Sequence, residues 1–208
     1  MKVKTKNKRY ACEADNCDNF AYAEMIRTGS ENRKGGWMYV CRKHYKLKLD
    51  KNGKPKEKQK ALALWAADCA ERVLPFFEKK YPKDNRPRKA ISACRTWVRT
   101  GVFKMKDIRK ASLDAHAAAR KALADNNSAA CFAARAAGQA VATAHVAQHA
   151  FGPSYYALKI AAADPANAKI KVAKEFNWQL HHLPKNLRKA WKDWQNKKLP
   201  KHLRKIIN

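Results

Sequence analysis

Four residues near the N-terminus have the types and spacing of a zinc site. Cys12 and Cys17 form a CxxxxC pair, and Cys41 and His44 form a CxxH pair after a loop of 23 residues. Two close ligand pairs separated by a loop of hairpin length can surround one tetrahedral zinc ion. Because protein atoms would fill all four coordination positions, the sequence predicts a structural Zn²⁺ ion rather than a catalytic one.

A disulfide between Cys12 and Cys17 is the main alternative to zinc. The chain starts with an alternating lysine-rich run and not with an apolar signal peptide, which predicts a reducing, cytoplasmic location. Cysteines in that compartment more often hold metal, and a segment this short and polar has little apolar surface with which to fold alone. We therefore expect zinc.

Three histidines in the rest of the chain could form a second metal site. His145 and His149 are four residues apart, and with His116 they could present three imidazole nitrogens to one ion. The pair does not enclose the glutamate of an HExxH motif. Core histidines bonded to neighbouring helices are therefore the favoured interpretation.

Asp68, Arg86 and Arg88 are predicted to form a polar cluster that holds the start of the second long helix to the first. An anion-binding pocket is the alternative use of these residue types. The sequence shows no activated nucleophile, no phosphate-binding glycine loop and no pair of catalytic carboxylates. We expect a protein that is not an enzyme.

The elements that would position these residues divide the chain into three predicted regions. Residues 1–50 form a basic arm and a zinc module similar to a treble clef, with a hairpin between the two ligand pairs and a helix after them. Residues 51–60 are a turn-rich basic linker, and residues 61–208 are an all-helical body. Apolar spacing, proline and capping residues predict helices over about residues 57–80, 84–101, 106–124, 128–150, 155–163, 165–181 and from 184 onward.

Alanine dominates the middle of the helical body. Residues 111–164 contain 22 alanines in 54 positions. Alanine has the highest helix propensity, and its small side chain lets helices approach closely. The predicted fold is mostly α: a compact, alanine-rich bundle of about six helices, with Cys69, Cys94 and Cys131 as small core residues.

The net charge is strongly positive throughout the chain. Lys and Arg number 46 against 17 Asp and Glu, which gives +29. The excess is shared evenly among the N-terminal, middle and C-terminal thirds, so it is not a basic tail. A polyanionic partner is expected because self-repulsion at this charge disfavours a compact state. No apolar run reaches the roughly 18 residues that would cross a bilayer, so no membrane span is predicted.

Several motifs in residues 61–190 occur together in one known family. They are Ala61–Leu74 with Trp65, Asp84–Ile91 with Trp97, Asp114–Arg120, Ala136–Ala150, and Glu175–Gln179 followed by Leu183-Pro184. In this order they resemble the Imm-5-like immunity proteins. The resemblance implies an all-helical fold in a family associated with neutralising bacterial toxins, and it implies no established reaction. The zinc module and the high positive charge are departures from that family.

Two functions of different classes follow. In the first, the chain is a non-enzymatic nucleic-acid-binding accessory protein, for RNA or DNA, that contacts the phosphate backbone within a larger assembly. In the second, the helical body binds and masks a toxin or another acidic partner protein. The expected phosphate contacts are the basic residues of the arm, hairpin tip, finger helix and C-terminal helices: Lys2, Lys4, Lys6, Lys8, Arg9, Arg33, Lys34, Arg42, Lys43, Lys46, Lys185, Arg188, Lys189, Lys192, Lys197, Lys198, Lys201, Arg204 and Lys205.

Overall fold

The computed structural model describes residues 57–207 and, before them, only the backbone of four two-residue strands. These strands form two antiparallel pairs: β1 (Tyr10–Ala11) with β2 (Phe20–Ala21), and β3 (Ile26–Arg27) with β4 (Trp37–Met38). The chain divides into two compact units, residues 1–56 and residues 57–208. The second unit is the helical one.

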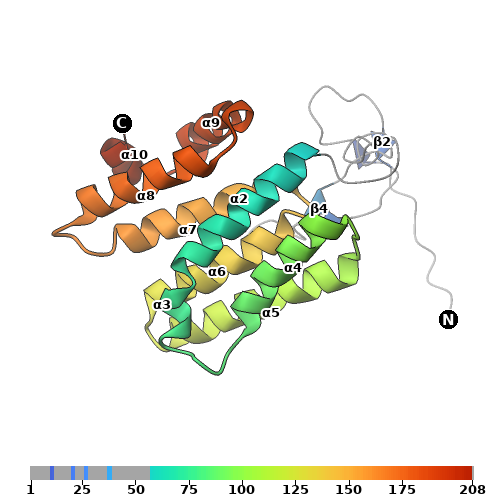
Figure 1. Cartoon of the computed structure of the whole chain (residues 1–208), viewed down its shortest axis with the longest axis horizontal. Coiled ribbons are helices and arrows are strands. Elements are labelled where there is room, and N and C mark those ends of the chain that lie inside the picture. Colours follow the sequence, from blue (N-terminus) through green and yellow to red (C-terminus); the bar gives the residue numbers. More distant parts are fainter. Residues whose placement is uncertain (1–9, 12–19, 22–25, 28–36, 39–56, 208) are drawn as a thin grey trace. The chain divides into compact units, whose positions relative to one another are not determined.

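Residues 57–207 form helices and turns without a strand (Figure 1). This part contains eight α-helices of seven residues or more, together with four-residue α3. In chain order they are α2 (Glu57–Val73), α3 (Pro75–Glu78), α4 (Arg86–Thr100), α5 (Met105–Ala124), α6 (Ser128–Ala142), α7 (Phe151–Ala161), α8 (Ala168–His182), α9 (Arg188–Lys198) and α10 (Lys201–Ile207), with the 3-10 turns η1 (Ala147–Ala150) and η2 (Lys185–Leu187). The helical class was predicted correctly, but about six helices was too few.

Helix α6 lies at the centre of this unit, and α2, α4, α5 and α7 pack around it (Figure 1). Ala133, Ala137 and Ala140 of α6 are completely buried. Small side chains let the neighbouring backbones come close: the Ser112 hydroxyl of α5 donates a hydrogen bond of 3.0 Å to the backbone carbonyl of Gly138. The alanine content of the sequence is thus the basis of the core.

Two buried tryptophans join α8 and α9 to this core. The Trp65 indole N–H of α2 donates to the Gln179 carbonyl of α8 at 2.9 Å, and the Trp191 indole N–H of α9 donates to the Ser154 hydroxyl of α7 at 3.3 Å. The two indole rings meet edge to face with centroids 5.6 Å apart. Each ring therefore buries a large apolar area while its polar N–H keeps a partner.

The first predicted helix, over residues 57–80, is divided in the structure. Helix α2 ends at Val73, and α3 begins at Pro75. Proline has no backbone N–H to donate to the residue four positions earlier, and its ring clashes with that carbonyl. The apolar spacing continues across the break, which is why periodicity alone predicted one helix.

The helix predicted over residues 128–150 ends earlier, at Ala142. The buried Gln59 side-chain amide of α2 donates to the carbonyls of Thr143 and Ala144, at 2.8 and 3.1 Å. These bonds satisfy carbonyl groups at the end of α6 that no helical N–H reaches. Pro153 lies in the first turn of α7, where the missing N–H costs nothing.

No helix among residues 57–207 is both long enough and apolar enough to cross a lipid bilayer.

Candidate functional site

The predicted zinc ligands lie outside the residues that the structure describes, as do the basic residues of the arm, hairpin tip and finger helix. The ligands Cys12, Cys17, Cys41 and His44 therefore remain a prediction from spacing, and so do the phosphate contacts proposed for that unit. The remaining candidate residues all lie in the helical unit.

The three histidines of the candidate second metal site lie in two segments of the chain. His145 and His149 lie in the segment between α6 and α7, with ring centroids 5.1 Å apart, and Nδ1 of His149 lies 2.6 Å from the Gln139 side-chain oxygen. The ring of His116, on α5, lies against Gly138 of α6. Among the described residues, no three His, Cys, Asp or Glu side chains come close enough to hold one metal ion.

His116 has an unusual electrostatic environment. A Cβ atom built on Gly138 would lie 3.0 Å from Cε1 and Nε2 of His116, so the glycine provides the space for this ring. Burial, together with the positive charges of Arg135 and Arg120, lowers the pKa of His116 to about 4. His116 is therefore a neutral packing residue at physiological pH.

The predicted cluster of Asp68, Arg86 and Arg88 does not form. Asp68 of α2 accepts a hydrogen bond of 2.8 Å from Arg95, which lies in the middle of α4. Arg86 and Arg88 lie in the first turn of α4, away from Asp68. Arg86 pairs with Asp84 at 2.5 Å, and Arg88 pairs with Glu78 at 2.5 and 2.7 Å.

The three core cysteines are buried, as expected. The Cys94 thiol lies 3.2 Å from the carbonyl of Ala140 on α6, and burial raises its pKa to about 12. Burial also raises the pKa of Cys69. A thiol reacts as the thiolate, so neither residue is a nucleophile at neutral pH.

Most of the predicted C-terminal cations are exposed. These are Lys185, Lys189, Lys192, Lys197, Lys198, Lys201 and Lys205. Arg188 and Arg204 are half-buried, and their guanidinium groups donate to the carbonyls of Leu183 and Asn196. Helices α9 and α10 with the turn before them thus present a basic surface.

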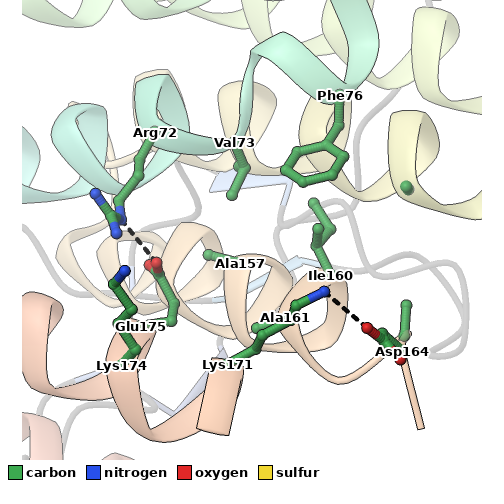
Figure 2. Close-up of a pocket in the computed structure, with 12 residues that line it drawn as sticks. Arg72, Val73, Phe76, Ala157, Ile160, Ala161, Asp164, Lys171, Lys174 and Glu175 are labelled. Carbon is green, nitrogen blue, oxygen red and sulfur yellow. Dashed lines mark hydrogen bonds and ion pairs between the residues drawn. The ribbon is translucent and has the colours of Figure 1, made fainter. Parts of the chain in front are cut away.

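Sequence reasoning missed a cleft of about 550 Å³ between α2–α3, α7 and α8. Figure 2 shows Arg72, Lys174 and Glu175 at one end and Asp164 with Lys171 at the other. Apolar side chains line the space between these two ends: Val73, Phe76, Ala157, Ile160 and Ala161. The cleft therefore combines an apolar middle with charged ends.

Arg72 is held in place by residues of α8. Its Nε donates to the buried Glu175 carboxylate at 2.7 Å, and its guanidinium lies 4.4 Å from the ring centroid of Trp178. The Gln179 side-chain amide donates to the other Glu175 oxygen at 2.9 Å. Charge pairing and stacking on the indole together fix the orientation of the guanidinium.

Phe76 is an exposed aromatic residue beside the cleft. Phe76 and Phe77 both fall within the helix predicted over residues 57–80, and the structure buries Phe77 while leaving Phe76 48% exposed beside the cleft. The sequence did not show which of these two adjacent rings would be exposed, so it did not locate the cleft.

Comparison with known proteins identified one family. The model of the Imm-5 like putative immunity protein family matches residues 54–186, which include α2 to α8 and the whole cleft. No curated protein and no solved structure matches the chain.

Proposed function

This chain belongs to the family of Imm-5-like immunity proteins, and on that basis we propose that its helical unit binds a toxin protein and masks the toxin's active surface. The observation that carries the proposal is the family match over residues 54–186. It covers the alanine core and the cleft, so the matched segment is most of the helical unit, from α2 to α8.

The charge of the chain defines which toxin surface it would fit. At +29, the protein would be repelled by the basic, nucleic-acid-binding surface of a typical nuclease. An acidic patch on the toxin would instead be attracted and steered toward it. We therefore propose a partner with an acidic contact surface.

Nucleic-acid binding is the weaker of the two functions predicted from the sequence. It rests on the net charge and on the exposed lysines of α9 and α10, whereas the family match favours a protein partner. Binding through phosphate contacts would fall steeply with salt: about six contacts imply roughly a thousandfold loss of affinity between 50 and 200 mM salt.

Two measurements distinguish these functions. The first is co-expression with candidate toxins, beginning with the products of genes beside this one, where we expect restored growth and a stoichiometric complex on size-exclusion chromatography with one of them. The second is binding to mixed RNA and DNA fragments across a salt series. Unrestored growth, combined with tight and salt-sensitive nucleic-acid binding, would replace the immunity function with the nucleic-acid function.

We also propose that the N-terminal unit holds one structural zinc ion through Cys12, Cys17, Cys41 and His44. The support is the spacing of the two ligand pairs. A closed site of this kind would fix the hairpin and helix around it without taking part in a reaction. Metal analysis of the purified chain, with one zinc per chain expected, tests the assignment.

A further inference from the structure

We propose that the cleft between α2–α3, α7 and α8 receives an apolar side chain of the partner protein, with a neighbouring carboxylate of the same segment bound at Arg72 and Lys174. The proposal rests on the proposed function, because it names the contact through which the immunity protein would hold its toxin. Three features of the cleft support it.

The first feature is the apolar middle of the cleft. Phe76 is 48% exposed there, beside Val73, Ala157 and Ile160, and Figure 2 shows the ring of Phe76 facing Ile160 across the opening. Large aromatic side chains at binding surfaces often serve as contact anchors. A partner leucine or phenylalanine placed here would cover the exposed ring and remove apolar surface from water on both proteins.

The second feature is the oriented guanidinium of Arg72. Glu175 binds it through Nε, and Trp178 covers one face, so the side chain is ordered before a partner arrives. In the part of the chain that the structure describes, only Nε of Arg72 makes a hydrogen bond, which leaves the N–H groups of the two terminal nitrogens. Such groups can bind a carboxylate with two parallel hydrogen bonds.

The third feature is the contrast between the two lysines of the cleft. The Lys171 ammonium is paired with Asp164 at 2.8 Å, whereas Lys174 is exposed and forms no ion pair with any described residue. The Lys174 ammonium lies at the same end of the cleft as Arg72 and Glu175 (Figure 2). That end of the cleft carries the two cations Arg72 and Lys174 and the one carboxylate Glu175. The net charge of these three groups is positive, which suits the binding of one further anion.

These features favour a protein segment over nucleic acid as the occupant. A phosphate backbone would meet the two cations but would leave the apolar middle of the cleft unused. A segment that carries an acidic residue beside a leucine or phenylalanine complements both the charged end and the apolar middle.

The experiment uses fluorescein-labelled peptides as probes of the full chain. The test peptide is Asp-Asp-Leu-Phe-Asp-Asp, and its controls are Asn-Asn-Leu-Phe-Asn-Asn, which lacks charge, and Asp-Asp-Ser-Ser-Asp-Asp, which lacks apolar side chains. Fluorescence anisotropy at physiological salt should show the test peptide bound about tenfold more tightly than either control. Equal binding of the test peptide and the serine peptide would mean that charge alone attracts them, and would overturn the proposal.

Matched variants locate the site on the chain. Lys174→Gln and Phe76→Ser should each weaken binding of the test peptide about fivefold to tenfold. Lys169→Gln makes the same change, and Ile170→Ser likewise replaces a large apolar side chain by serine, at exposed positions of α8 that do not line the cleft. Both variants should bind as the wild type does. Equal effects in both pairs of variants would refute the location.

The same variants separate this proposal from the proposed function. If the wild type protects cells from the toxin and the Phe76→Ser, Lys174→Gln double variant protects equally well, the immunity function stands and the cleft is not its contact. If the test peptide binds in the cleft but the wild type forms no complex with the toxin, the immunity function fails. Circular dichroism confirms that each variant is folded.

Discussion

Acidification should destabilise the helical unit through His116. Its pKa is lowered to about 4 in the folded chain, while the ordinary value in an unfolded chain is 6.5. Below pH 6.5 the unfolded chain therefore takes up a proton that the folded chain does not, and stability is lost as the pH falls from 6.5 toward 4. From these two values, the free energy of unfolding should drop by about 2 kcal/mol between pH 7 and pH 5.

Urea denaturation followed by circular dichroism measures this effect. The variant His116→Gln cannot gain the proton and should lose about 2 kcal/mol less than the wild type over the same pH interval. His202→Gln is the matched control, since His202 is exposed on α10. The interval avoids the contribution of Asp164, whose pKa, lowered to about 2 by Lys171 and Asn167, matters only at lower pH. Identical pH dependence in the wild type and in His116→Gln would refute the reasoning.

Three further predictions concern single residues. Gln59→Leu should lower the free energy of unfolding by about 2–4 kcal/mol, because it removes both buried hydrogen bonds to the end of α6. The control Gln148→Leu, at an exposed position, should change it little. Equal urea midpoints for the two variants would contradict this. Cys94 should react with a thiol reagent at pH 8 only after denaturation, because its pKa is about 12, and rapid labelling of the native chain would show otherwise. Cys41→Ser should lose the bound zinc in metal analysis but leave the thermal transition of the helical unit in place, and retained zinc would remove this residue from the ligand set.

Local signals in the sequence located several helix ends correctly. The Asn127 side chain accepts a hydrogen bond from the Ala130 N–H at the start of α6, as a capping residue before an alanine run predicts. Gly101 ends α4 in the left-handed conformation, with φ of 68°, which a glycine after the last apolar position predicts. Such ends depend on neighbouring residues and can be predicted from them.

The end of α6 and the cleft depend on residues far apart in the sequence. Neither glycine nor proline occurs between Ala142 and Ala150, and the donor to the end of the helix is Gln59, 84 residues away from Thr143. Likewise, Arg72 and Glu175 meet only because α2 and α8 pack in the same unit. Spacing along one helix carries no information on such contacts.

The same distinction explains the polar cluster. The sequence predicted that Asp68 would pair with Arg86 and Arg88 at the start of α4. In the structure its partner is Arg95, which lies farther along that helix. Sequence reasoning identified the residue types that form ion pairs between α2 and α4, and the packing offset between the two helices decided which residues met.

The alanine core has a consequence for how stability varies with temperature. Nearly half of the buried apolar residues of the helical unit are alanines, each of which exposes less apolar surface on unfolding than a leucine or phenylalanine would. The heat capacity of unfolding rises with exposed apolar surface, and a small heat capacity flattens the curve of free energy against temperature. Calorimetry should therefore find a heat capacity change below the usual 12–15 cal/mol/K per residue, so that the stability of the helical unit varies little over a broad range of temperatures.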